Sequence, residues 1–282
     1  MLKIDFHTHA FPDAIANKTI ALLSKQGGIP PFSDGTETGT VQVLKEAGIS
    51  MGIVLPVVTK PEQFPSVTRF AAAVNEKYRA DRESLMKEEF HRNACLLSFG
   101  GIHPDSANYK AELKQLSEQG FLGIKLHPDY QGVNFDDIRY MRIIEYATEL
   151  GLIVVTHAGV DIGFPDCVRN TPKMAKRVIS EVQPDKLVLA HMGGYGLWEE
   201  VLECLAGESV YFDTAFCFGR MPSEQMHRLI SAHSENRILF ATDCPWGKPT
   251  EFTAQMEQLE LTEEQKSKIF GKNALRLLGF SE

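Results

Sequence analysis

Short runs of β-branched and aromatic residues alternate with longer amphipathic stretches along the whole chain. The stretch Asp136–Leu150 is typical of the latter, because its apolar residues recur every three or four positions, as on one face of a helix. Strands that alternate with helices in this way indicate βαβ units and a parallel sheet. The apolar runs predict eight strands, which are Leu2–Phe6, Gly52–Leu55, Leu96–Ile102, Gly123–Leu126, Ile153–Thr156, Leu187–Ala190, Val210–Phe212 and Ile238–Ala241.

Eight such units can close into a (β/α)8 TIM barrel, and 282 residues suit one barrel better than two domains. We therefore expect an α/β fold with a single domain over residues 1–282. A doubly wound open sheet is the rival, because periodicity alone does not exclude it. Gly27–Gly39 is predicted to be a loop between two early helices. Thr262–Leu278 is predicted to contain a capped helix that begins at Thr262.

Composition narrows the class of partner. The net charge of −8 argues against nucleic acid or an anionic membrane as the main partner. A local basic pocket, a small-molecule substrate and a homo-oligomer all stay open. No apolar run approaches the roughly 18 residues that span a bilayer, and the N-terminus lacks the pattern of a signal peptide. The five scattered cysteines form no CxxC pair, so we expect reduced thiols in a cytoplasmic protein.

Polar residues gather at the ends of the predicted strands. Asp213 and Asp243 end the seventh and eighth strands, and six of the nine histidines lie at or just after strand ends: His7, His9, His103, His127, His157 and His191. In a barrel this rim is where catalytic groups converge. The clustering predicts an enzyme.

His7-Thr8-His9 is an HxH pair, whose two side chains point the same way on a strand and can bind one ion. Asp5 shares that face and is expected to orient a ligand. HxH alone is equally compatible with two exposed histidines in a turn, and a lone strand-end histidine is more often structural. A buried carboxylate such as Asp243 needs a cation or donors. The order HxH, His, His, Asp along the strands favours a metal site.

These motifs resemble the amidohydrolase superfamily, in particular its amidohydrolase-related branch, called family 2. The resemblance spans the chain and is carried by Ile4–His9, Thr156-His157, Leu189–Gly194, Ala241–Trp246 and Phe270–Leu278. It implies that His7, His9, His157 and Asp243 bind one divalent ion, with His191 close by as a catalytic residue. Three imidazoles and a carboxylate suit Zn²⁺ best, with Mn²⁺, Fe²⁺ or Co²⁺ as alternatives.

Such an ion lowers the pKa of bound water from about 15.7 towards 7. Asp243 is then expected to be both ligand and general base, while His191 holds the attacking water or polarises the substrate.

Lys125 is expected to point into the barrel, because Ile124 and Leu126 take the opposite face. Relatives with two metals have a carboxylated lysine or a glutamate on this strand, so a second ion requires carboxylation of Lys125. An unmodified Lys125 that binds a substrate anion or contacts Asp5 is the favoured prediction.

Four further residues are candidates for substrate binding. His103 and His127 end strands, Arg220 follows the seventh strand and suits a carboxylate, and Trp246 is a candidate for an apolar wall.

The leading hypothesis for the reaction is metal-dependent hydrolysis of a C–N, C–O or lactone bond in a small molecule. The alternative is non-oxidative decarboxylation of an aromatic or unsaturated carboxylic acid at the same metal site. A metal-binding barrel without catalysis is the third hypothesis.

Overall fold

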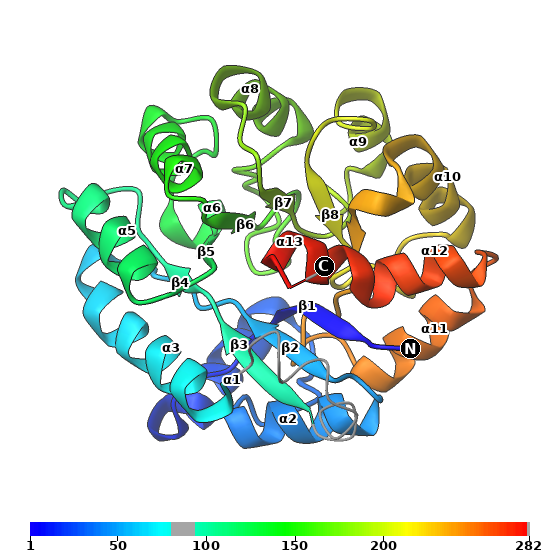
Figure 1. Cartoon of the computed structure of the whole chain (residues 1–282), viewed down its shortest axis with the longest axis horizontal. Coiled ribbons are helices and arrows are strands. Elements are labelled where there is room, and N and C mark those ends of the chain that lie inside the picture. Colours follow the sequence, from blue (N-terminus) through cyan, green and yellow to red (C-terminus); the bar gives the residue numbers. More distant parts are fainter. Residues whose placement is uncertain (80–93, 281–282) are drawn as a thin grey trace.

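Strands and helices alternate along the chain in the computed structural model, which describes residues 1–79 and 94–280 (Figure 1). The strands are β1 (Ile4–Thr8), β2 (Met51–Val54), β3 (Cys95–Ser98), β4 (Gly100–Gly101), β5 (Gly123–Leu126), β6 (Ile153–Thr156), β7 (Leu187–Leu189), β8 (Tyr211–Asp213) and β9 (Ile238–Leu239). Each of the eight predicted strands is thereby found, and β3 and β4 together take the place of the predicted strand Leu96–Ile102, beginning one residue earlier at Cys95.

The helices follow the strands and surround them (Figure 1). The α-helices are α1 (Asp13–Gly27), α2 (Glu37–Glu46), α3 (Phe64–Tyr78), α5 (Tyr109–Glu118), α6 (Pro128–Gln131), α7 (Ile138–Glu149), α8 (Pro172–Val182), α9 (Trp198–Cys204), α10 (Ser223–His233), α11 (Pro249–Gln258), α12 (Glu263–Ser267) and α13 (Asn273–Leu278). The short 3₁₀-helices are η1 (Pro61–Gln63) and η3 (Glu235–Arg237), and η4 (Lys268–Lys272) is a short π-helix.

All strand pairs are parallel, and the strands form a closed barrel. One sheet has the order β1-β2-β3 and the other runs from β4 to β9 in sequence order. Phe99 separates β3 from β4 and donates its N–H to the carbonyl of Val54 at 2.9 Å, so the two form one interrupted strand. The barrel closes where the Phe6 N–H donates to the carbonyl of Phe240 at 2.9 Å. The predicted TIM barrel is confirmed.

Alternation along the strands sorts their side chains into two apolar layers. Ile124 and Leu126 belong to the layer between strands and helices, and Lys125 between them points inward, as predicted. The layer inside the barrel includes Phe6, Phe99 and Val155, together with residues of α13. The backbone of Leu2 approaches Gly271, so the C-terminal segment covers the end where the strands begin. The opposite rim is left for the functional side chains.

Local signals place several helix ends as the sequence predicts. Thr262 accepts a hydrogen bond from the N–H of Gln265 and forms a capping box at the start of α12. The predicted loop Gly27–Gly39 is shorter in the structure, because α1 continues to Gly27 and Thr36 caps α2.

Two further expectations concern the whole chain. The five cysteines form no disulfide. None of the helices in the described ranges combines the length and apolar character that a bilayer crossing requires.

Candidate metal centre

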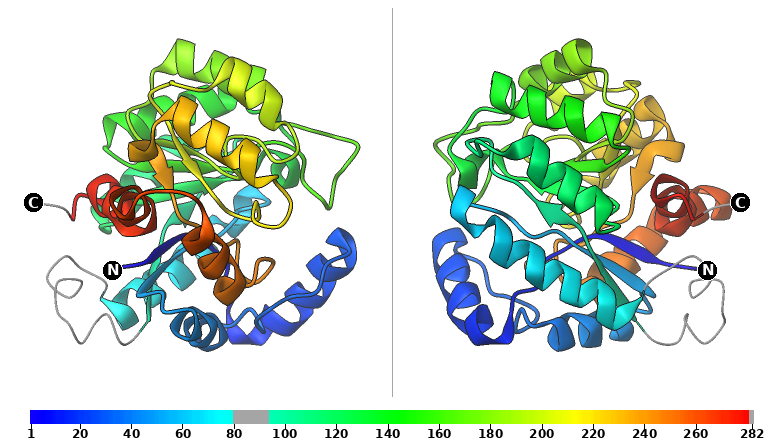
Figure 2. Two further views of the ribbon diagram at one scale, coloured as in Figure 1. Left: turned by 90° about the vertical axis from the view of Figure 1, so that its right-hand side faces the viewer. Right: turned by 60° about the vertical axis from the view of Figure 1, so that its left-hand side comes forward.

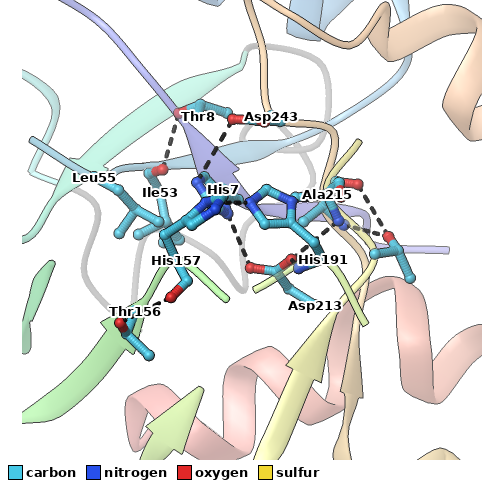
Figure 3. A network of polar contacts seen from close by, with 12 residues as sticks. His7, Thr8, Ile53, Leu55, Thr156, His157, His191, Asp213, Ala215 and Asp243 are labelled. Atoms are coloured by element: carbon cyan, nitrogen blue, oxygen red, sulfur yellow. Dashed lines mark hydrogen bonds and ion pairs between the residues drawn. The ribbon is translucent and has the colours of Figure 1, made fainter. Parts of the chain in front are cut away.

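The rim at the carboxyl ends of the strands carries a converging set of polar side chains (Figure 3). Three of them come from the two strands that close the barrel. The Nε2 atoms of His7 and His9 lie 3.6 Å and 3.1 Å from Oδ1 of Asp243. These three residues form one of the two groups, among the described residues, whose ligand atoms are close enough to share an ion. We call them the HxH–Asp group.

The two imidazoles of the HxH–Asp group are oriented by hydrogen bonds on their other nitrogens. Nδ1 of His7 donates to the carboxylate of Asp213 at 2.9 Å, and Nδ1 of His9 donates to the carbonyl of Leu55 at 3.1 Å. With each proton on Nδ1, both Nε2 lone pairs face Asp243. Burial, and next the charge of Lys125, hold the pKa of His7 well below its ordinary value, so that ring is neutral. Neutral rings held this way are what a divalent ion requires.

Asp243 supplies the negative charge of the group. Burial raises the pKa of its carboxyl, whereas positive charge on the neighbouring His7 and His9, which a bound divalent ion would replace, lowers that pKa to about 2. Carboxylates and imidazoles are typical ligands for Zn²⁺ or another divalent first-row ion. The donor set therefore fits the metal that the sequence predicts.

Asp213 is a centre of hydrogen bonding that the sequence left ambiguous. It is fully buried, and besides His7 it accepts hydrogen bonds from the backbone N–H groups of His191 and Ala215, at 2.9 Å and 3.0 Å. One carboxylate on β8 thus fixes a ring on β1 and the backbone at the end of β7. Asp213 positions both His7 and His191.

Asp5 has a different part from the one expected of it. Its carboxylate accepts hydrogen bonds from the N–H and the hydroxyl of Thr242, at 2.9 Å and 2.5 Å, and from the N–H of His7. It makes no hydrogen bond to any imidazole of the described residues, and His7 is instead hydrogen-bonded to Asp213 on β8. Asp5 instead ties the end of β9 to β1, and so sets where the backbone presents Asp243.

Lys125 reaches the HxH–Asp group from inside the barrel. Its Nζ lies 3.1 Å from Nε2 of His7 and is fully buried, and burial lowers its pKa to about 8. No hydrogen bond joins it to Asp5, so that part of the prediction is wrong; Asp5 is occupied by Thr242. Lys125 also lies beneath the cavity surface and is not one of its lining residues.

A second group of possible ligands lies beside the first. It consists of His127, His157 and Asp161, which we call the His–His–Asp group. The rings of His127 and His157 stack with centroids 4.4 Å apart, and Nε2 of His127 lies 3.5 Å from Asp161. The structure thus places His157 in this group and not with the HxH–Asp group, so its role as a ligand of the same ion stays a prediction.

His191 lies between the two groups and is hydrogen-bonded to one of them. Its Nδ1 donates to the carbonyl of Ala215 at 2.8 Å, so its Nε2 accepts from Nδ1 of His157 at 3.0 Å. This leaves Nε2 of His157 without a hydrogen-bond partner, 3.8 Å from Asp129. A buried, unpaired nitrogen is costly, which means that the ring of His157 has an unmet need for a donor or a cation.

Backbone conformation is unusual at two of the predicted catalytic residues. His191 and Asp243 have φ angles of +58° and +65°, in the left-handed region that non-glycine residues seldom adopt. Such conformations cost on the order of 1–3 kcal/mol and persist where the surroundings fix them. The N–H of Asp243 donates to the carbonyl of His7, and Asp213 binds the N–H of His191. These bonds hold both side chains on the rim.

The two groups form the inner end of a cavity of about 590 Å³. His127 and Trp246 line it, as predicted for substrate-binding residues, although binding itself stays a prediction. His103 does not line it and accepts a hydrogen bond from the N–H of Asp105 on Nδ1 instead. Arg220 is exposed and does not line the cavity, but it lies 3.5 Å above the ring of Phe216 and its charge also acts on Tyr195, and both of these residues line the cavity.

Several cavity residues escaped the sequence analysis. Tyr130, Asp161 and Tyr195 line the cavity and lie a few residues after the strand-end histidines. Each comes three or four residues after a histidine of the rim: His127, His157 or His191. That spacing is the signal that points to them, since the first turn after a barrel strand belongs to the same rim.

The chain is a closed parallel barrel with histidines and a carboxylate on its carboxyl rim, which is where barrel enzymes have their active sites. The model of the amidohydrolase family matches residues 4–280, and the chain belongs to that family. No curated protein sequence matches this chain.

Solved structures share the fold at low sequence identity. An uncharacterised TIM-barrel protein from Bordetella bronchiseptica has a TM-score of 0.73 and 17% identity, over 99% of each chain. A 2,6-dihydroxybenzoate decarboxylase from Rhizobium has a TM-score of 0.69 and 16% identity, again over 99% of each chain. A dihydroxybenzoic acid decarboxylase from Polaromonas, solved with manganese and 2-nitroresorcinol, has a TM-score of 0.69 and 16% identity, over 100% of this chain and 98% of that one.

Proposed function

We propose that this protein is a metal-dependent, non-oxidative decarboxylase of a hydroxylated aromatic or unsaturated carboxylic acid. The observation that carries the proposal is the HxH–Asp group at the inner end of an apolar cavity. The likeness to solved decarboxylases, one of them solved with manganese, supports it. This choice reverses the order of the two reactions that the sequence suggested, where hydrolysis came first.

His7, His9 and Asp243, joined by His157, would hold a divalent ion, which would supply positive charge that polarises the oxygen atoms of the substrate. No lysine or arginine is among the described lining residues, so no basic side chain competes with the ion for the carboxylate. Manganese is the alternative to the zinc that the sequence favoured, because imidazoles suit zinc whereas carboxylates suit manganese, and one of the solved decarboxylases holds manganese. The metal content of protein purified without added ions decides between them.

His191 is the residue we assign to proton transfer. The bond between the ring carbon and the carboxylate breaks, CO2 leaves with neither electron of that bond, and the carbon keeps the pair. Nε2 of His191, which accepts a hydrogen bond from His157 in this structure, takes up a proton from solvent once His157 has turned towards the ion, and that proton then forms the new C–H bond. Nδ1 of His191 stays bonded to Ala215, so Nε2 is the nitrogen that exchanges protons. Proton transfer by a positioned side chain contributes about 10²–10⁴-fold in rate.

The test follows the carboxylate carbon and the incoming proton. Metal-loaded protein is incubated with 2,6-dihydroxybenzoate and related acids that carry ¹³C in the carboxylate, in D2O. We expect labelled CO2 together with one deuterium on the ring.

Hydrolysis is the second candidate function, favoured by the family to which the chain belongs. Cleavage of esters, amides or lactones without CO2 from any acid would establish that candidate and reject ours.

The metal content of the same preparation shows whether each chain holds one ion or two. We propose one ion per chain and an unmodified Lys125. Two ions together with a native mass increased by one CO2 would instead show a carboxylated Lys125. If protein that holds stoichiometric metal shows neither decarboxylation nor hydrolysis, that result would favour a binding module without catalysis.

A further inference from the structure

The cavity has two chemically different parts. Its inner end holds imidazoles and carboxylates, whereas its outer wall is built by apolar side chains of α1, α3 and the loops beside them. The apolar residues of this wall are Ile15, Leu22, Leu23, Ile29, Val67 and Phe70. We call them the α1–α3 wall. It is continuous with the inner end through Leu55 and Val57, so one ligand can touch both.

A bridge between two distant segments borders this wall, of which Ile15 and Leu22 stay 49% and 62% exposed. The side chain of Gln26, at the end of α1, donates to the carbonyl of Gly163 in the loop between β6 and α8, at 3.3 Å. Gly27 lies against Ile162 of the same loop, where an added Cβ would stand 3.0 Å from its Cδ1. Figure 2 shows α1, in blue, projecting from the barrel towards the tip of this green loop. The cavity therefore has a built outer part and is more than a depression over the metal site.

The charges of the cavity limit what this outer part accepts. Among the described lining residues the carboxylates are Asp161 and Asp243, and no lysine or arginine accompanies them. A second anionic group on the substrate would meet no counter-ion at the α1–α3 wall and would lose its hydration there. An apolar group instead gains free energy in proportion to the area that it buries.

Size points in the same direction. About 590 Å³ lies within the ~300–1,000 Å³ that encloses drug-sized ligands. At about 30 Å³ for each water-sized group, it holds roughly twenty non-hydrogen atoms, whereas a dihydroxybenzoate has about half that number. A one-ring acid at the inner end therefore leaves the α1–α3 wall uncovered.

We infer that the α1–α3 wall is a subsite for a hydrocarbon group, so the substrate joins one polar head to an apolar substituent. The position of the head at the metal rests on the proposed function, whereas the subsite for the substituent does not. The substrate class is accordingly an alkyl- or aryl-substituted acid and excludes polyanionic or phosphorylated molecules.

A series of 4-alkylbenzoates from ethyl to octyl, titrated into the metal-loaded protein by calorimetry, tests this inference. We expect affinity to rise about fourfold for each methylene that becomes buried, until the chain reaches the mouth. The heat-capacity change of binding should become more negative along the series. An affinity that does not change with chain length would overturn the subsite.

Two variants locate the effect on the α1–α3 wall. Leu23 and Phe70 are half-buried, so Leu23→Gln and Phe70→Gln should preserve the fold while removing most of the dependence on chain length. Ile138 offers a matched control, because it is 56% exposed at the start of α7 and lies outside the cavity. Ile138→Gln should leave the whole series unchanged. Equal losses in all three variants, or none in the first two, would contradict the assignment.

The failure of the subsite and that of the proposed function are distinguishable. Binding of 1-hexanol, 1-octanol and 1-decanol to metal-free protein needs neither turnover nor an ion. Affinity that rises along the alcohols, with no CO2 from any acid, would reject the decarboxylase and keep the subsite. CO2 from 2,6-dihydroxybenzoate, with equal affinities for all alkyl chains, would reject the subsite alone.

Discussion

The HxH–Asp group and the His–His–Asp group hold similar side chains a few ångströms apart, yet they differ in how those side chains are oriented. In the first, Asp213 and Leu55 fix the outer nitrogens of His7 and His9, so both inner nitrogens face one carboxylate. In the second, Nδ1 of His127 and Nε2 of His157 have no hydrogen-bond partner. The first group is prepared for an ion before the ion arrives, while the rings of the second are held by their mutual stacking and by one hydrogen bond between His157 and His191.

This difference teaches that residue type does not by itself define a metal site. Supporting hydrogen bonds select the tautomer and the ring orientation, and they are typically worth 10–100-fold in metal affinity. We therefore expect the ion to bind first at the HxH–Asp group, with His157 turning towards it from the second group. The variants below separate the two groups.

Loss of His7 should have the largest effect. His7→Ala removes a predicted metal ligand. It also removes the ring that lies between Lys125 and Asp213, so both buried side chains lose their contact with it. We expect metal affinity to fall by more than about 100-fold and activity to disappear, measured by metal analysis and turnover. His127→Ala, from the second group, is the control and should retain its metal. Equal metal loss in the two variants would mean that the groups are equivalent.

His157 and His191 should separate metal binding from catalysis. His157→Ala is expected to abolish activity and lower metal content, because we assign the ring to the ion. His191→Ala should keep most of its metal while kcat falls by about 10²–10⁴-fold, as for a lost proton donor. Metal content and kcat measured on the same preparations decide this. A similar loss of metal in both variants would show that His191 is wrongly assigned.

Asp213→Asn should have an intermediate effect. The amide keeps the size of the side chain but can no longer accept every hydrogen bond that the carboxylate receives from His7, His191 and Ala215. We expect metal to bind about 10–100-fold more weakly, with the ligands themselves intact. Asp161→Asn is the matched control in the second group and should change affinity by less than about threefold. The opposite ranking in a competition with a chelating dye would show that the second group binds the ion first.

Removal of the metal should change stability least. An ion present at 100 times its dissociation constant stabilises the folded state by about 2.7 kcal/mol. For a chain of this size, chelation should lower Tm by roughly 5–10 °C, and the ion should restore it. The His7→Ala variant should show no such shift, whereas His127→Ala should behave as the parent does. A shift that survives in His7→Ala would place the ion elsewhere.

Much of the fold was predictable because its signal is local. Buried parallel strands are near-continuous apolar runs, and each of the eight runs became a strand. Inward orientation of Lys125 followed from strand alternation, and the cap of α12 from Thr262 and Gln265. The identity of the rim histidines followed from their place at strand ends. Periodicity could not choose between the barrel and an open sheet; the bonds from β1 to the segment after β9 decided that.

The sequence by itself determined which side chains reach the carboxyl rim, because the alternation of side chains along a strand and the position of its end both depend on the local sequence. Only the tertiary structure decided their partners. Asp213 took the part expected of Asp5, since β8 brings its carboxylate to His7 whereas Thr242 occupies Asp5. The bridge from Gln26 to Gly163 joins segments 137 positions apart, and neither segment carries a local sign of the other. Strand order is a property of the chain, but hydrogen-bond partners across a barrel depend on its closure.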